Sequence, residues 1–475
     1  MADRQRGAQG QERGGGGAPV AARFGLASLR RRLTDPQARQ IAGNTSWLIA
    51  ERVLRGVLSL VATVVIARYL GRAEFGTLNY ALSFVLLFAT LWQLGLSGIV
   101  VRELVRSPEE QAEMLGTVFA LRLAGGVAGF LAIVAAALLV APDDPATRIS
   151  IIVLGLATIF YAFEGIDFWL QSRVMSQYAV LARLGAVAIS VCVSLVLVVL
   201  GAPVVAFAAA ASLEFVVGGL GYLVAYLWLQ QSPLRWTVSL PRARALLALS
   251  WPLIVSGVFN AINLRIDQLM LGNMRGAESV GVYAAAARLS EVWYFVPLAI
   301  ATATFPALIR SRDLGPATYA RRVQRLMDLM IWLSVPLALA VTVSSGFVIQ
   351  LLYGDRFADA APMLAVHIWA GPFVFMGVVL SRWLIAEGHL KFSFVRTGIG
   401  AAVNIGANLL LIPQLGGNGA AIATLVSYAA ASYFACLVYR PTWPMARVMS
   451  LALMLPIRTA ARVTRGWRPR GHPAA

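Results

Sequence analysis

Long apolar stretches, separated by short polar segments, make up most of the chain. A window of ~19 residues, which suits membrane-spanning helices, predicts twelve spans. They cover residues 44–67, 77–101, 114–140, 149–170, 178–200, 204–228, 246–271, 280–309, 326–352, 362–385, 392–411 and 419–439. A further apolar stretch, residues 448–457, is too short to span and ends in basic residues, so we expect it to lie in the membrane interface. The pattern predicts an all-α, polytopic membrane protein.

The composition agrees with a membrane protein. Hydrophobic residues make up 59% of the chain and charged residues 13%, about half the charged share of a soluble domain. The net charge of +18 comes almost entirely from arginine. These arginines lie in short gaps between apolar stretches, which indicates contact with anionic membrane lipid and excludes nucleic acid as a partner. The two cysteines lie within apolar stretches and form no zinc or disulfide pattern, so we expect no cofactor.

The charges of the loops alternate along the chain. Alternate loops carry a group of basic residues: Arg102, Arg106, Arg173, Arg235, Arg242, Arg244, Arg310, Arg312, Arg321, Arg322, Arg325 and Lys391. The intervening loops are short or acidic, as at Asp143 and Asp144. Because basic loops stay in the cytoplasm, both termini are predicted to be cytoplasmic. Residues 1–40 have few large apolar side chains and are predicted to be a disordered basic tail rather than a signal peptide.

Two segments repeat at a fixed distance along the chain. Residues 73–78 (AEFGTL) resemble residues 277–282 (AESVGV), and Gly76 and Gly281 lie 205 positions apart. The same distance relates the starts of the first and seventh spans. We therefore predict an N-lobe at 41–229, a linker at 230–245, a C-lobe at 246–440 and a basic C-terminal tail at 441–475. Transporters built from such halves bind substrate between the lobes.

Several arginines fall inside predicted spans, where charges usually face a cavity. Arg52 and Arg55 share a face of the first helix because they are three residues apart, and Arg265 lies in the corresponding helix of the second half. Guanidinium groups on facing helices suit phosphate and pyrophosphate. We predict that Arg52, Arg55, Arg122, Arg265 and Arg288 bind an anionic substrate.

Structural ion pairs are the alternative for some of these arginines. Arg55 lies four residues after Glu51, and Glu291 lies three residues after Arg288, so each pair could form within one helix. The other three arginines have no carboxylate on the same face of their own helix.

Three intramembrane carboxylates are candidates for coupling transport to Na⁺ or H⁺: Asp267, Glu164 and Asp167. Asp267 is two residues from Arg265 and points to a different face of the helix. A carboxylate held away from water can take up and release a proton. An ion pair between helices is the alternative for Asp267.

Short motifs connect these features to a known family. They are residues 44–47 (NTSW), 67–71 (ARYLG), 74–76 (EFG), 94–96 (LGL), Pro252, Asp267, 280–283 (VGVY) and 286–289 (AARL). Over residues 40–440 the chain resembles the polysaccharide-biosynthesis flippases of the O-antigen type, which belong to the multidrug/oligosaccharidyl-lipid/polysaccharide exporter (MOP) superfamily. The resemblance implies two helical lobes in a V around a central cavity, in the bacterial inner membrane.

The resemblance also implies a substrate and partners. Such a flippase moves an isoprenoid-pyrophosphate-linked oligosaccharide to the outer leaflet by alternating access, and the cavity arginines hold the pyrophosphate. Glycosyltransferases and a polymerase of the same pathway are the expected partners, and the protein itself is expected not to be an enzyme.

Three other functions compete with this interpretation. A MATE-type, ion-coupled drug or cation antiporter would have a cavity of carboxylates and aromatic residues, whereas arginine is at least as prominent here. A lipid II flippase would carry two further helices. A membrane glycosyltransferase or polymerase would need catalytic carboxylates on a large extracytoplasmic loop, and Asp143 and Asp144 lie in a short one.

Overall fold

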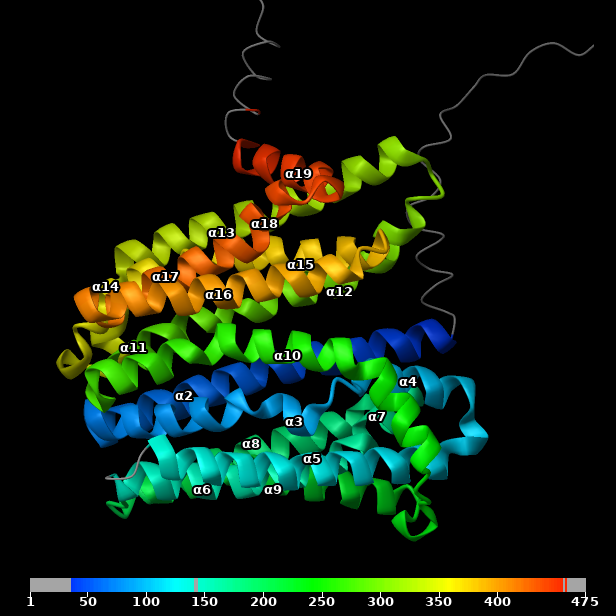
Figure 1. Ribbon diagram of the computed structural model, residues 1–475, viewed down its shortest axis with the longest axis horizontal. Coiled ribbons are helices and arrows are strands. Elements are labelled where there is room, and N and C mark those ends of the chain that lie inside the picture. Colours follow the sequence, from blue (N-terminus) through cyan, green and yellow to red (C-terminus); the bar gives the residue numbers. More distant parts are fainter. Residues whose placement is uncertain (1–35, 141–143, 456–457, 459–475) are drawn as a thin grey trace, which may run out of the picture.

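The computed structural model describes residues 36–140, 144–455 and 458, and these are nearly all helical (Figure 1). The predicted disordered tail, residues 1–40, lies outside the described residues except for 36–40, which begin the first helix. The predicted C-terminal tail is described only as far as 455 and at 458.

The N-terminal half forms one group of helices. They are α2 (Pro36–Leu87), α3 (Ala89–Gln93), α4 (Ser97–Arg106), α5 (Gln111–Val140), α6 (Pro145–Ala157), the 3₁₀ helix η3 (Thr158–Glu164), α7 (Gly165–Ser172), α8 (Ser176–Val199) and α9 (Val204–Trp228). We call this group the N-lobe.

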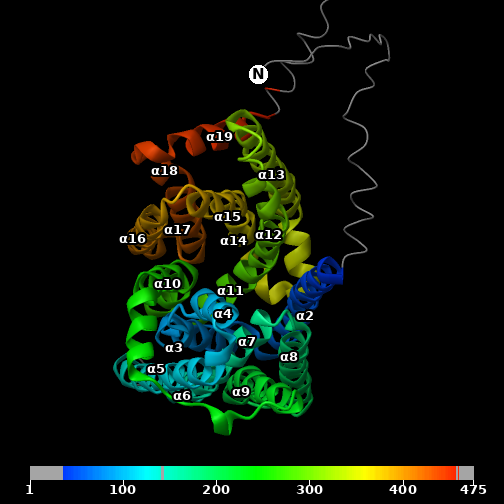
Figure 2. The ribbon, with the colours of Figure 1, turned by 90° about the vertical axis from the view of Figure 1, so that its right-hand side faces the viewer.

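The C-terminal half forms the second group, the C-lobe. It contains α10 (Leu240–Arg275), α11 (Ala277–Glu291), the 3₁₀ helix η5 (Val292–Tyr294), α12 (Phe295–Arg310), α13 (Pro316–Tyr353), α14 (Ala360–His367), α15 (Ala370–Ala386), α16 (Leu390–Leu415), α17 (Gly417–Ala429), the π-helical turn η7 (Ala430–Phe434), α18 (Ala435–Val438) and α19 (Trp443–Leu453). Figure 2 shows the N-lobe below and the C-lobe above.

Eleven helices in the described part of the chain are long and apolar enough to cross a membrane, one fewer than the sequence predicted. The difference lies in α2, which contains the first predicted span and part of the second. Its two parts meet at Gly71, where the backbone is not helical (φ 72°, ψ −175°). Figure 1 shows the blue ribbon turning back there at the left end of the molecule. We call this end of the molecule the Gly71 end. The opposite end, where residues 230–239 connect the lobes, is called the linker end.

The backbone repeats between the lobes. Gly276 joins α10 to α11 with φ 84° and ψ 171°, close to the angles at Gly71. The two glycines are 205 positions apart, as are the segments that resemble each other in sequence. Positive φ of this kind favours glycine, because a Cβ would clash with the backbone.

The two lobes meet through a close contact between α2 and α11. A Cβ added at Gly76 would overlap the carbonyl oxygen of Ala277, and a Cβ at Gly281 would overlap that of Arg72. These two contacts are equivalent under the shift of 205 residues, so the helices cross near an approximate two-fold axis. Glycine at both positions lets the backbones approach closely, as small residues do in membrane helix interfaces.

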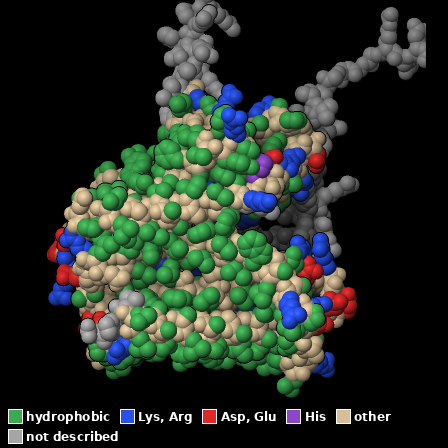
Figure 3. All heavy atoms as spheres, in the orientation of Figure 1, with side chains coloured by type: hydrophobic (Ala, Val, Ile, Leu, Met, Phe, Trp, Pro, Cys, Tyr) green, Lys and Arg blue, Asp and Glu red, His purple; other side chains and the backbone are tan. Residues whose placement is uncertain are grey.

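The apolar cores show where the lobes join and where they separate. One cluster contains residues of both lobes, such as Phe75 of α2 and Tyr283 of α11, and lies toward the Gly71 end. Toward the linker end, a cluster around Leu115 of the N-lobe also contains Leu246 of α10, and the later helices of the C-lobe form a separate cluster around Met330. Beyond α10, the C-lobe thus has a core of its own toward the linker end, and Figure 3 shows the surface hollowed between the lobes there.

Much of the outer surface is apolar. Large side chains such as Leu139, Val199 and Val343 are more than four-fifths exposed, and hydrophobic side chains cover the middle of the face in Figure 3 while charges gather at its two ends. Soluble proteins do not expose apolar patches of this extent. The belt identifies the surface that faces lipid.

The start of α10 is attached to the N-lobe. The backbone N–H of Ser239 donates to the Thr117 hydroxyl at 3.1 Å, and Arg242 pairs with Glu110 and, at 3.1 Å, with Glu113. The end of the segment that connects the lobes, at Ser239, and the first turn of α10 therefore contact α5 directly.

The apolar stretch after the last span forms part of α19. This helix begins at Trp443, earlier than the stretch predicted at 448–457, and buries Met445 and Met449. The indole N–H of Trp332 in α13 donates to the Ala452 carbonyl at 2.8 Å. The helix packs along α13, and its position in the membrane interface stays a prediction.

Candidate functional site: an arginine-lined cavity between the lobes

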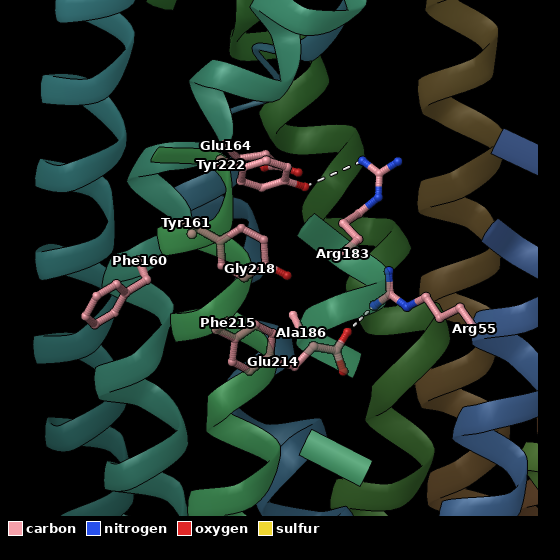
Figure 4. A pocket seen from close by; sticks show the side chains of 11 residues that line it. Arg55, Phe160, Tyr161, Glu164, Arg183, Ala186, Glu214, Phe215, Gly218 and Tyr222 are labelled. Atoms are coloured by element: carbon pink, nitrogen blue, oxygen red, sulfur yellow. Dashed lines mark hydrogen bonds and ion pairs between the residues drawn. The ribbon is translucent and has the colours of Figure 1, made fainter. Parts of the chain in front are cut away.

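Three neighbouring pockets lie along the inner wall of the N-lobe. The interlobe pocket, of about 590 Å³, is lined by α2, α7 and α8 and by the end of α11, with Glu291, η5 and α12 of the C-lobe. The N-lobe pocket, of about 100 Å³, lies among α2, η3, α8 and α9 (Figure 4). The deep pocket, of about 150 Å³, continues toward the Gly71 end and is reached by Arg288 from α11. Shared lining residues, among them Arg55 and Glu214, connect the three.

Three arginines line the interlobe pocket: Arg52, Arg55 and Arg183. Arg52 is exposed to the cavity and has no ion-pair partner within 4.0 Å among the residues that the structure describes. The sequence predicted Arg52 and Arg55 from their shared helix face. It did not single out Arg183, because a lone arginine in the fifth span has no neighbour in its own helix that indicates a role.

Arg183 connects three helices. Its Nε donates to Glu51 on α2 at 3.3 Å, and its Nη1 donates to Asp167 on α7 at 3.1 Å. Asp167 is buried and also accepts a hydrogen bond from Gln171 at 3.1 Å. Asp167, predicted as an ion-coupling residue, is therefore one partner in a structural ion-pair network.

Arg55 pairs mainly with a residue of another helix. Its guanidinium forms an ion pair with Glu214 of α9 (Figure 4), whereas Glu51 in its own helix lies 3.9 Å away. The arginine side chain is 43% exposed, so this pair remains in contact with the cavity. The local pairing that the sequence left open is thus the weaker of the two contacts.

Arg122 is buried within the N-lobe instead of facing the cavity. It pairs with Glu164 at 2.5 Å, and its Nε donates to the Trp92 carbonyl at 3.1 Å. Trp92 lies in the last turn of α3, where the membrane span breaks at Leu94 (φ 54°) and Gly95 (φ 60°). A helix end at membrane depth needs partners for its free carbonyls, and a cation suits a helix C-terminus. Substrate binding by Arg122 stays a prediction, which the burial of this side chain and its pair with Glu164 do not favour.

Arg265 and Arg288 come from the C-lobe. Arg288 lines the deep pocket together with Glu214, and Arg265 is half-buried on α10. Within the described ranges neither guanidinium has a carboxylate within 4.0 Å, so the possible pair of Arg288 with Glu291 is not formed. Arg288 thus faces the N-lobe residues of the deep pocket, whereas Arg265 is not among the residues that line the three pockets.

Asp267 forms a separate polar cluster inside the C-lobe. Its carboxylate is 3% exposed and accepts hydrogen bonds from Asn408 at 2.5 Å, Thr424 at 2.5 Å and Tyr283 at 3.1 Å. In the part of the chain that the structure covers, no basic side chain lies within 4.0 Å of it. The alternative of an interhelical ion pair is therefore not realised. The Oδ1 atom of Asn408 is also buried without a partner among the described residues.

The fold defines the class of protein. A MATE-family multidrug resistance transporter of the MOP superfamily, in an inward-facing conformation, superposes with a TM-score of 0.67 at 16% identity, over 84% of this chain and 95% of that one. The lipid II flippase MurJ, in an inward closed conformation, superposes with a TM-score of 0.66 at 14% identity, over 86% of this chain and 90% of that one. The chain thus has the two-lobed fold of MOP-superfamily membrane proteins.

The sequence defines the family within that class. A family model described as polysaccharide biosynthesis protein matches residues 41–312, more than half of the chain, so the chain belongs to this family. A second model, MatE, matches residues 252–410. The relative named Probable flippase AglR, from Haloferax volcanii, is 31% identical over 176 residues, which are 36% of this chain and 36% of that protein. The matched part spans between 24% and 36% of the length of the curated relatives.

Proposed function

We propose that this protein is a flippase, not an enzyme, that carries an isoprenoid-pyrophosphate-linked oligosaccharide from the cytoplasmic to the outer leaflet of a bacterial inner membrane. The observation that carries the proposal is the group of cavity arginines, of which Arg52 and Arg288 have no carboxylate within 4.0 Å among the described residues. Uncompensated guanidinium groups in a membrane cavity are costly, so an anionic substrate would stabilise them. The family supports a role in polysaccharide synthesis.

The ion pairs in the cavity are compatible with exchange of partners. The side chain of Arg55 is 43% exposed and that of Glu214 is 32% exposed, so their ion pair is accessible to solvent. Pairs of this kind contribute about 0–1 kcal/mol, whereas a bidentate contact with phosphate is stronger and more directional. A pyrophosphate could therefore bind Arg52 first and then draw Arg55 away from Glu214.

The charges at the linker end support an orientation for this cavity. The basic loops that contain Arg102, Arg235 and Arg322 lie at that end, where the lobes separate. By the positive-inside rule this end faces the cytoplasm, with both termini, and anionic lipid meets its exposed arginines. The cavity would then receive substrate from glycosyltransferases on the cytoplasmic side and deliver it to a polymerase outside.

Reconstitution into liposomes with a fluorescent lipid-linked oligosaccharide tests the proposal. We expect the triple variant Arg52→Ala, Arg55→Ala and Arg265→Ala to lower the rate at which the glycan becomes accessible in the opposite leaflet by about a hundredfold or more, the loss expected for two or three charged hydrogen bonds. Arg235→Ala, an exposed arginine outside the cavity, is the matched control. Translocation by the triple variant at the wild-type rate would refute the pyrophosphate site.

We further propose that Asp267 is the site at which Na⁺ or H⁺ couples to transport. Three observations support it: the carboxylate is buried, no basic residue compensates it within the described ranges, and the Oδ1 atom of Asn408, which has no partner among the described residues, and the hydroxyl oxygens of Thr424 and Tyr283 lie around it. Hard cations prefer oxygen ligands of this kind, and a buried carboxylate is also suited to carry a proton.

One variant tests the role of Asp267, and separate gradients across membranes with the wild type tell the two ions apart. Asp267→Asn keeps the size of the side chain and removes its charge, so we expect transport driven by an ion gradient to be lost while downhill exchange persists. Imposing a Na⁺ gradient and a pH gradient separately on wild-type proteoliposomes identifies the ion. Glu109→Gln, at an exposed position on the linker end, is the control. Gradient-driven transport that survives in Asp267→Asn would contradict this role.

A further inference from the structure

The N-lobe pocket is rich in aromatic side chains. Four of its lining residues are aromatic: Phe160, Tyr161, Phe215 and Tyr222. In Figure 4 the phenol oxygens of Tyr161 and Tyr222 and the carboxylate of Glu214 point toward the side of the pocket where Arg55 and Arg183 lie.

A distortion in one membrane span creates this pocket. Between α6 and α7 the chain adopts the 3₁₀ helix η3, in which residues three apart lie on one face. Tyr161 and Glu164 are so related, and both line the pocket. On the opposite wall, a Cβ at Gly219 would come within 2.7 Å of the Phe160 carbonyl, so α9 packs directly against the backbone of η3.

The charges of the pocket are already balanced. Glu164 pairs with Arg122 at 2.5 Å, and Glu214 pairs with Arg55. An organic cation would have to compete with these arginines, so the pocket does not favour one. Paired carboxylates still have lone pairs that accept hydrogen bonds from neutral hydroxyl groups.

The remaining groups suit a neutral, polyhydroxylated ring. The Tyr161 hydroxyl has no hydrogen-bond partner among the described residues and borders the cavity. Its ring lies 5.4 Å from that of Phe215, tilted by 40°, which leaves two aromatic faces at an angle to each other. Aromatic side chains bury apolar C–H faces well, and tyrosine adds a polar group at the edge of its ring. A pyranose has both C–H faces and hydroxyl groups.

The pocket also lies beside the arginine site. Arg55 and Arg183 line the N-lobe pocket as well as the interlobe pocket, so a ligand could span both. We propose that the N-lobe pocket binds the first sugar of the lipid-linked glycan, the one bonded to the pyrophosphate. This inference rests on the proposed function and names the part of the substrate that this protein distinguishes.

Binding to two synthetic lipids tests the proposal. The purified protein in nanodiscs is titrated with a polyprenyl pyrophosphate and with the same lipid carrying one N-acetylhexosamine. We expect the wild type to bind the sugar-bearing lipid more tightly. Tyr161→Leu should weaken binding of that lipid by roughly fivefold to tenfold, as for loss of an aromatic contact, and leave the bare lipid unaffected. Tyr161→Phe, which keeps the ring, should show a smaller loss with the same selectivity.

Two controls separate this proposal from the proposed function. Arg52→Ala should lower the affinity for both lipids equally. Tyr178→Leu, at an aromatic position outside the pocket, should leave both affinities unchanged. The sugar subsite is overturned, and the flippase function is not, if the wild type binds the two lipids with equal affinity. The same conclusion follows if Tyr161→Leu lowers the affinity for both lipids equally. If the wild type binds neither lipid, both the sugar subsite and the proposed flippase function are overturned. If ethidium binds and Tyr161→Leu abolishes that binding, the pocket is a cation site.

Discussion

Charged residues in the membrane-spanning part of this protein divide into those that join helices within the N-lobe and those that have no partner of opposite charge among the described residues. Arg122, Arg183 and Asp167 are partners in networks between helices, whereas Arg52 and Asp267 face a cavity or a cluster of neutral groups. A membrane protein tolerates an uncompensated charge only where function requires it. The difference in partners is therefore the best guide to which charges act in transport.

Arg122 should prove essential for stability rather than for substrate binding. Arg122→Gln removes the ion pair with Glu164 and the hydrogen bond to the Trp92 carbonyl. Breaking a buried pair on one side costs about 3–5 kcal/mol, which should lower the thermal unfolding midpoint in detergent markedly. Arg52→Ala, in which no pair is lost, should unfold like the wild type.

A double variant checks the cause of that loss. Adding Glu164→Gln to Arg122→Gln leaves two neutral amides that can hydrogen-bond to each other, and should recover part of the stability. If Arg122→Gln unfolds at the wild-type temperature, the structural role assigned to Arg122 is wrong.

The sequence predicted what local spacing determines and missed what packing determines. Arg52 and Arg55 share a face because helical periodicity fixes it, and Asp267 was notable simply for lying in an apolar stretch. The partners of Arg122 and Arg183 lie on other helices, 42 positions away for Glu164 and 132 for Glu51. Such pairings depend on how helices pack, which hydropathy and spacing do not contain.

At the scale of elements, the contact between α2 and α11 closes the Gly71 end. Beside the glycine crossing, Arg72 donates to Asp359 at 2.8 Å and reaches Glu278 at 3.5 Å, both in the C-lobe. Arg68 donates to the Leu352 carbonyl at 2.6 Å. The contacts of Arg68 and Arg72 across the lobes explain why arginine is placed at this end of the molecule.

Adding one methyl group at this crossing should favour opening of the Gly71 end. In Gly76→Ala the new Cβ would overlap the Ala277 carbonyl, a backbone atom that cannot move alone, so α2 and α11 must separate. Spin labels at Ile149 and Asp355, both exposed near this end, should report longer distances. Gly346→Ala, where a Cβ meets nothing within 4 Å, is the control and should leave the distances unchanged. Unchanged distances in Gly76→Ala would show that the crossing does not control this end.

At the scale of the whole molecule, the two ends differ in both packing and charge. A core shared by helices of both lobes and ion pairs join the lobes at the Gly71 end, while at the linker end α10 packs on the N-lobe, the later C-lobe helices have a core of their own, and the loops are basic. Alternating access requires one end to close as the other opens. The arrangement described here fits the state in which the cavity is open to the linker end, and its functional meaning depends on which side of the membrane that end faces.

Cysteine labelling determines this orientation. In a variant without the two native cysteines, Cys192 and Cys436, single replacements are made at Arg235 on the linker end and at Asp355 on the Gly71 end, both exposed. We expect a membrane-impermeant maleimide to react with Asp355→Cys in intact spheroplasts, and with Arg235→Cys only after the membrane is opened, because the basic loops are held inside. The reverse pattern would make the cavity open outward. The arginines would then meet substrate from outside, and export of a lipid-linked glycan would no longer explain them.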